Sequence, residues 1–424
     1  MEEGSSNTGK SNNNPTGINQ FKDCPPKNDE QTAALITGYH KRGITGKLQI
    51  SELLAEEHDI KMSQRTVARR LKDLGLKGSG ATTREMPLPQ KRQLVLDQLA
   101  VDPSSRRGPR MIKEYITHDT GLHLTRDFIE QEMRIHDPDG FAVRLPTAKK
   151  ISRRPIVCLG PHHEWSADGH DKLAKIGFPI WGVRDVWGGK WLGLWVVPNN
   201  RLKLAVAYLY LQLVEELGGM SVQMTTDCGS ETTEIFGLAN ALREAFSPHL
   251  IDPGGSNVLP AHRFMKSVHN ITIERGWLRL RLQWGDNVKV FWEAGSGVYD
   301  ATNHHQYELV QWLWSKLIQQ ELDHLRSTFN DHKVRRNKEK LGPSGVSPNI
   351  ATALYAKYGG EWGLQPVDVN VVRQLKEELG GEDLVRFVPA EYATHAQTIY
   401  DSLGIESLEF NNVWNIFTLM LPLI

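Results

Sequence analysis

The stretch that decides the fold is His163-Glu164-Trp165-Ser166-Ala167-Asp168-Gly169-His170-Asp171, which reads as a short strand carrying an acid. Two further acids have similarly distinctive contexts, Asp227 in Thr225-Thr226-Asp227-Cys228-Gly229-Ser230-Glu231 and Glu274 in Ser267-Val268-His269-Asn270-Ile271-Thr272-Ile273-Glu274-Arg275. Phosphodiester chemistry uses clustered carboxylates, because paired Mg²⁺ or Mn²⁺ ions about 3.5–4 Å apart stabilise the attacking and leaving oxygens. The three acids are therefore candidate ligands of one shared metal site.

The order of elements around these acids predicts an α/β fold. Period-two alternation and turn residues predict strands at 164–170, 178–186, 190–197 and 221–226, and apolar periodicity predicts helices at 202–217 and 230–246. A loop rich in Pro and Gly follows at 247–262, and a further helix carries Glu274. This order is that of a ribonuclease-H-like mixed five-stranded sheet with flanking helices. Gaps of 58 residues between the first two acids and 46 between the last two fit this fold.

The region before this core is predicted to be helical. Residues 1–30 read as a disordered tail, 31–80 as a helix-turn-helix-like DNA-binding unit, and 88–143 as a second helical DNA-binding unit. In a helix from Gln64 to Leu74, capped by Ser63, the residues Val67, Leu71 and Leu74 are expected to face inward. Arg65, Arg69 and Arg70 are then expected on the outer face. A three-helix unit with a solvated basic face explains this pattern about equally well.

Charge is unevenly distributed along the chain. The 424 residues contain 50 basic and 50 acidic side chains, but residues 41–154 carry 23 Lys and Arg against 15 Asp and Glu. A basic segment suits contacts with DNA phosphates, although a solvated basic face is equally compatible with the charge alone. Residues 144–154 read as a basic linker, in which Lys149, Lys150, Arg153 and Arg154 are candidates for contacts with the DNA backbone.

Composition excludes several other classes of protein. The three cysteines, Cys24, Cys158 and Cys228, are far apart, so a disulfide framework is not expected and a reducing compartment fits. His162 and His163 near Cys158 are interpreted as surface histidines. No signal peptide or membrane-spanning segment is expected, because the apolar stretch 413–424 is shorter than the roughly 20 residues that a bilayer requires.

The motifs around the three acids resemble the integrase core domain of the retroviral-integrase and DDE-transposase superfamily, particularly eukaryotic transposon-derived integrase-like proteins. The resemblance covers residues 155–294 and implies that Asp168, Asp227 and Glu274 bind two Mg²⁺ or Mn²⁺ ions. It implies metal-dependent DNA cleavage and strand transfer, a homo-oligomer acting on transposon ends and target DNA, and residence in the nucleus. The histidine-cysteine zinc module of retroviral integrases is absent, so the helical units would replace it.

Several neighbouring residues have alternative interpretations. Asn270 lies one helical turn before Glu274 and either contacts DNA or positions Glu274. Arg275 is a candidate for phosphate contacts. Asp171 is a rival metal ligand but reads better as a surface residue, and Trp277 and Trp284 read as core. Residues 295–424 are expected to form a mainly helical accessory region.

Two other functions compete with an active integrase or transposase. The chain could be a catalytically inactive, integrase-derived DNA-binding protein, or a ribonuclease-H-like nuclease acting on other nucleic acids. Intact acids favour catalysis over the inactive protein, and tandem helical units favour DNA recombination over the other nuclease.

Overall fold

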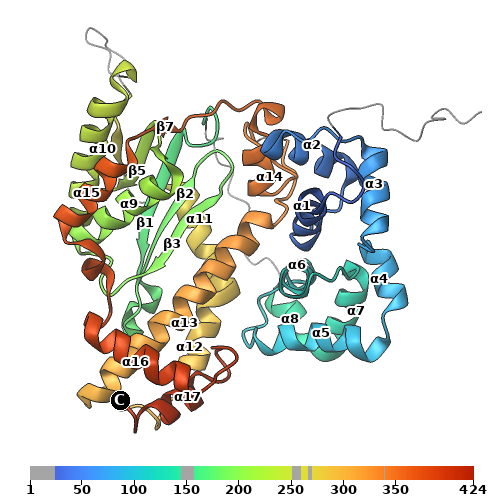
Figure 1. Cartoon of the computed structure of the whole chain (residues 1–424). Helices are drawn as coiled ribbons and strands as arrows, with labels where there is room; N and C mark the ends of the chain where they lie inside the picture. Colours follow the sequence, from blue (N-terminus) through green and yellow to red (C-terminus); the bar gives the residue numbers. More distant parts are fainter. Residues whose placement is uncertain (1–23, 145–156, 251–258, 266–269, 339) are drawn as a thin grey trace, which may run out of the picture. The chain divides into compact units, whose positions relative to one another are not determined.

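The computed structural model describes residues 24–144, 157–250, 259–265, 270–338 and 340–424 (Figure 1). The chain divides into two compact units, residues 1–77 and 78–424. Because the arrangement of the two units is not determined, each is described separately. Lys149, Lys150, Arg153 and Arg154 of the predicted linker lie outside the described residues.

The first unit packs three helices, α1 (Glu30–Lys41), α2 (Lys47–His58) and α3 (Gln64–Asp73), around a small apolar core. Ile36, Leu53 and Val67 are fully or almost fully buried in this core. The helix limits follow local chemistry: the Oγ of Ser63 accepts a hydrogen bond from the backbone N–H of Thr66 at 3.2 Å. Gly75, at φ +67°, takes the left-handed conformation just beyond the end of α3.

Two expectations for this unit are wrong in detail. Leu74 is exposed, because α3 ends at Asp73 and Leu74 lies in the following turn. Arg70 is buried rather than outward-facing, and its guanidinium donates to the carbonyls of Pro25 and Pro26, each at 2.7 Å. Residues 24–29, which the sequence assigned to a disordered tail, cover this face of α3, and Asp29 caps α1.

The second unit contains a mixed sheet of five strands in the order β3-β2-β1-β5-β6. The strands are β1 (Glu164–His170), β2 (Ile180–Asp185), β3 (Trp191–Val196), β5 (Gln223–Asp227) and β6 (His262–Met265). The strand β1 is antiparallel to β2 and parallel to β5, and β5 is parallel to β6. This arrangement, with helices on its faces, is consistent with the predicted ribonuclease-H-like fold (Figure 1).

The two faces of the sheet bury different sets of side chains. On one face, Trp165 and Ala167 of β1 pack with α9 (Lys203–Leu217), α10 (Thr233–Phe246) and α15 (Val369–Leu379). On the other face, β3 packs against the long helix α13 (His304–Asp331), and β1 and β2 contact α11 (Ile271–Leu280). Alternate residues of a strand point to opposite faces, which leaves Ser166, Asp168 and His170 on the α11 side.

Helices that precede and follow the sheet complete the second unit. Before it lie α4 (Ser79–Glu85), α5 (Leu88–Ala100), α6 (Pro109–Thr120), α7 (Arg126–His136) and α8 (Pro138–Val143). After α11 lie a π-helical turn at 281–285, α12 (Asp286–Glu293), α13, α14 (Pro348–Ala353), α16 (Ala390–Ser402) and α17 (Val413–Met420). The short strands β4 (Gly219–Met220) and β7 (Gln365–Pro366) form a separate pair.

Three further expectations concern these flanking segments. The sequence Pro138-Asp139-Gly140 predicts a turn, but these residues instead begin α8, since proline fits the first turn of a helix. His162 is buried, and its Nδ1 accepts a hydrogen bond from Trp165 Nε1 at 3.1 Å, so it is not a surface residue. No helix among the described residues is both long enough and apolar enough to cross a membrane.

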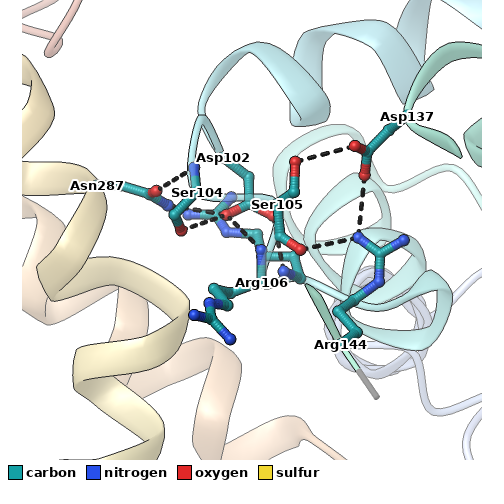
Figure 2. Close-up of polar contacts among 8 residues, drawn as sticks. Asp102, Ser104, Ser105, Arg106, Asp137, Arg144 and Asn287 are labelled. Carbon is teal, nitrogen blue, oxygen red and sulfur yellow. Dashed lines mark hydrogen bonds and ion pairs between the residues drawn. The ribbon is translucent and has the colours of Figure 1, made fainter. Parts of the chain in front are cut away.

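A helical module formed by α5–α8 packs on α12 and α13 within the second unit. Its own core contains Val95, Ile112, Ile129 and Met133. At the α5–α6 loop, buried Asp102 accepts hydrogen bonds from the backbone N–H of Arg107 at 2.7 Å and from Asn287 Nδ2 at 2.9 Å (Figure 2). Figure 2 also shows Asn287 Oδ1 accepting from the backbone N–H of Ser104 at 2.9 Å. The predicted second helical unit is thus attached to the core.

Candidate active site

Strand pairing brings the first two candidate acids close together. The parallel register of β1 and β5 pairs Ser166 with Thr225. Continuing this register by two residues places Asp168 beside Asp227, on strands that lie about 4.8 Å apart. Both side chains are half-buried, and Asp227 is the last residue of β5. Two acids predicted from separate motifs therefore meet at one position on the sheet.

Helix α11 carries the third acid across the same face. Asn270 precedes the first residue of this helix and is buried. Its side chain bonds β1: Nδ2 donates to the carbonyl of Ala167 at 3.3 Å, and Oδ1 accepts from the Ser166 hydroxyl. The exposed Glu274 lies one turn later, and its N–H donates to the Asn270 carbonyl at 3.3 Å. Of the two roles predicted for Asn270, this geometry favours positioning Glu274 over contact with DNA.

Trp277, predicted to belong to the core, also contacts the first acid. It is buried, and its Nε1 donates to Asp168 Oδ2 at 3.0 Å. The indole ring stacks on the imidazole of His170 with centroids 4.9 Å apart and packs against Trp191 at 5.0 Å. Sequence reasoning missed Ser166 and His170 as neighbours of the site. Their offsets of minus two and plus two from Asp168 on a strand were the available signal.

Close packing of α11 on the sheet depends on two glycines. A Cβ on Gly182 would lie 2.5 Å from Trp277 Cη2, and a Cβ on Gly276 would lie 2.6 Å from Trp191 Cζ2. Arg184 is half-buried beneath the helix, where it donates to the carbonyl of Thr272 at 2.6 Å. Its guanidinium also lies 4.8 Å from the ring centroid of Trp191. These contacts set the distance between Glu274 and the strands.

The electrostatics of the three acids favour binding of a cation. Burial, followed by the charge of Asp227, raises the pKa of Asp168 to about 7; the Trp277 hydrogen bond opposes this shift, and Glu274 adds to it. The Oδ1 of Asp227 is buried and has no hydrogen-bond partner among the described residues. An unsatisfied buried carboxylate oxygen is costly, and a bound divalent ion would supply its missing partner.

These donors fit the metal ions expected from the sequence. All three are hard carboxylate oxygens, the ligand type that Mg²⁺ and Mn²⁺ prefer. Within the described segments, the three carboxylates are not all within 4.8 Å of one another, so they do not form a compact single-ion cluster. A site for two ions does not require all three carboxylates to lie so close together, because its ligands are divided between the ions.

Other predicted site residues lie elsewhere or are used differently. Arg65 and Arg69 are exposed on α3 of the first unit, and Arg275 is exposed beside Glu274. Asp171 makes an ion pair with Arg201 at 2.7 Å and accepts from Asn200 Nδ2 at 2.8 Å, so its carboxylate has ordinary surface partners. The catalytic and DNA-binding roles of these residues stay predictions.

The order of the five strands and the helices on both faces of the sheet are consistent with the ribonuclease-H-like class of folds. Residues 157–346 match the family model described as "Integrase core domain". This match supports membership of the integrase and DDE-transposase superfamily, as the sequence motifs predicted. Comparisons with curated proteins and with solved structures gave no match.

Proposed function

We propose that this chain is a metal-dependent integrase or transposase that cleaves DNA strands and transfers them to a target, with Asp168, Asp227 and Glu274 as its catalytic acids. The observation that carries this proposal is the meeting of β1, β5 and α11 at one place on the sheet of an integrase core domain. Two ions of Mg²⁺ or Mn²⁺, when bound, would activate the attacking oxygen and stabilise the leaving one.

The residues around the acids have separate tasks in this proposal. Trp277 Nε1 holds Oδ2 of Asp168, which leaves Oδ1 available as a ligand. Asn270 ties the start of α11 to β1 and so positions Glu274. The exposed Arg275 is placed to bind a DNA phosphate near the acids.

DNA binding would also involve the first unit. We infer that α3 presents Arg65 and Arg69 to DNA, because both are exposed on one short helix whose opposite face forms the core. The helical module α5–α8 and the basic stretch at 144–154 are further candidates for contacts with the DNA backbone. Joining two DNA ends to a target requires several active sites, so a homo-oligomer working in the nucleus is part of the proposal.

The proposal is tested with full-length protein and labelled duplex DNA in Mn²⁺, comparing wild type with Asp227→Asn. We expect cleavage and strand transfer by the wild type and a loss of at least about 1,000-fold in the variant, as for removal of an essential catalytic group. Asp171→Asn is the matched control, because this acid follows β1 directly but pairs with Arg201. It should retain activity.

Other outcomes would identify the competing functions. DNA binding by the wild type without cleavage in Mn²⁺ or Mg²⁺ would indicate an integrase-derived binding protein. Preferential cleavage of an RNA–DNA hybrid would indicate a ribonuclease. Equal activity of wild type and Asp227→Asn would overturn the assignment of the acids. Light scattering of the protein with and without DNA ends tests the oligomer.

A further inference from the structure

A second group of metal-ligating side chains lies between α6 and α13, formed by residues outside the proposed triad. His118 and Asp119 are consecutive residues near the end of α6, and His324 lies within α13. One ligand atom from each residue lies within 4.8 Å of the other two. Residues 206 positions apart in the sequence thus bring two imidazoles and a carboxylate to one point.

The spacing of these atoms suits a small tetrahedral site. His324 Nε2 lies 3.2 Å from Asp119 Oδ1, and His118 Nδ1 lies 3.7 Å from the same oxygen. Metal–ligand bonds of about 2.0–2.1 Å give a tetrahedron with edges of about 3.3–3.4 Å. The two imidazole rings have centroids 4.8 Å apart and are tilted by 36°. Two of the three distances between ligand atoms are therefore close to the edge of such a tetrahedron.

The outer atoms of two ligands are already held by hydrogen bonds. His118 Nε2 lies 2.8 Å from the Ser327 hydroxyl, so its Nδ1 is the nitrogen left toward Asp119. Asp119 Oδ2 accepts from Gln98 Nε2 of α5 at 2.7 Å, which leaves Oδ1 toward the histidines. Such outer partners are typical of metal-binding histidines and carboxylates, because they fix the ligand orientation.

The third ligand atom, His324 Nε2, has no hydrogen-bond partner among the described residues. It is buried, and it lies 3.2 Å from Asp119 Oδ1. The three side chains remain about a third exposed to solvent, which provides a path of entry.

We propose that His118, Asp119 and His324 bind a divalent transition-metal ion, Zn²⁺ in the first place, with a fourth position open to water. Two imidazoles and one carboxylate favour Zn²⁺ over Mg²⁺, which prefers oxygen ligands in octahedral geometry. Because the ligands come from α6 and α13, the ion fastens the helical module to the core. The site acts independently of the proposed catalytic acids.

The test uses full-length protein stripped of metal, with Zn²⁺ titrated against a chromogenic chelator and Co²⁺ as a spectroscopic probe. We expect one Zn²⁺ per chain at this site, Co²⁺ absorption bands of tetrahedral nitrogen and oxygen coordination, and a higher Tm with Zn²⁺. Affinity should fall at least about 100-fold in His324→Ala and in Asp119→Asn. His395→Ala is the matched control, since this histidine is exposed on α16, and it should bind as the wild type does.

Asp227→Asn as an additional variant and a second readout on Asp119→Asn make the result decisive. Asp227→Asn should retain this Zn²⁺ site and its Co²⁺ spectrum, which separates the proposal from the catalytic one. Asp119→Asn preserves the shape of the side chain, so a loss of Zn²⁺ binding without a loss of the metal-free fold supports direct ligation. Unchanged Zn²⁺ affinity in both His324→Ala and Asp119→Asn would overturn the proposal, as would Zn²⁺ binding that disappears only in Asp227→Asn.

Discussion

At the scale of single residues, exposure distinguishes two adjacent arginines of α3. Arg69 is exposed, whereas Arg70 is buried and donates to the carbonyls of Pro25, Pro26 and Lys27. A helical repeat assigns both to the outer face, because it contains no information about the segment 24–29 that covers one of them. The two residues are therefore expected to differ in function despite their identical chemistry.

Substituting each arginine separately tests this difference. Arg69→Ala should weaken DNA binding with little effect on stability. The slope of log binding constant against log salt concentration should decrease in magnitude by about one. Arg70→Ala should cost on the order of 1–3 kcal/mol of local stability, because the buried carbonyls lose their partner. Fluorescence anisotropy at several salt concentrations measures the first effect. Hydrogen exchange across 30–74 in the full-length protein measures the second, and equal exchange in both variants would contradict it.

Because the pKa of Asp168 is raised in the folded chain, we expect the free energy of unfolding of the metal-free protein to depend on pH. The pKa is about 7 in the folded chain, mainly through burial, against 3.8 for a free side chain. The contribution of the Asp168 carboxyl to the free energy of unfolding is fully present below about pH 4, where the group is protonated in both states. It decreases as the pH rises toward 7 and is absent above that pH. Asp168→Asn removes the charge while keeping an acceptor for Trp277. It should stabilise the EDTA-treated protein at pH 8 by on the order of 2 kcal/mol, and hardly at pH 4.

Denaturant unfolding at the two pH values measures this effect. Mg²⁺ should stabilise the wild type at pH 8 and have much less effect on Asp168→Asn, since the ion offsets the same charge. Asp171→Asn serves as the control, because it loses an ion pair with Arg201 and should gain nothing at pH 8. An Asp168→Asn variant that is less stable than the wild type at pH 8 would contradict the electrostatic account.

At the scale of elements, the sequence predicted what depends on local pattern. The bounds of β1 agree with the prediction, and α9 ends at Leu217, the predicted limit, where Gly218 takes the left-handed conformation at φ +65°. The position of β6 was not predicted, because its four residues follow a Pro- and Gly-rich loop and pair only with distant β5. Likewise, the meeting of Asp168 and Asp227 follows from a parallel register that no local pattern specifies.

The packing of α11 on the sheet gives a prediction at this scale. Gly276→Ala places a Cβ 2.6 Å from Trp191 Cζ2 and 2.8 Å from Arg184 Nη1, so the helix must shift. We expect a loss of about 1–3 kcal/mol in stability. Strand transfer should fall by about 10- to 100-fold, because Glu274, two residues earlier, moves with the helix.

Gly237→Ala is the matched control for this helix. Gly237 is exposed in α10, and a Cβ there would meet nothing within 4 Å. Alanine at such a helical position should stabilise the protein by about 0.5–1 kcal/mol and leave strand transfer unchanged. Calorimetry and the strand-transfer assay together distinguish the two variants. A Gly276→Ala protein with normal stability and activity would show that Glu274 does not depend on this close packing.

At the scale of the whole second unit, the helical module has its own core. It is attached to the rest of the unit by polar contacts with α12 and α13 and by Met111 and Tyr115 of α6, which belong to the main apolar core. Asn287 of α12 is buried and bonds Asp102, the backbone N–H of Ser104 and the carbonyl of Val101 (Figure 2). His118 and Ser327 make a separate contact between α6 and α13. Because the module has a core of its own, we expect its attachment and its internal folding to be separable.

Asn287→Ala should loosen the module without unfolding it. The substitution removes three hydrogen bonds and deprives buried Asp102 of a partner, which should cost on the order of 1–3 kcal/mol. Hydrogen exchange should rise in the α5–α6 loop and in α12, whereas amides around Val95 and Ile129 should keep their protection. Asn240→Ala is the control, since its side chain is more exposed and bonds the preceding turn of its own helix, at the carbonyl of Phe236. If exchange instead rises uniformly through the module, its core and its attachment form one cooperative unit, and the module is a part of the catalytic fold rather than an appended domain.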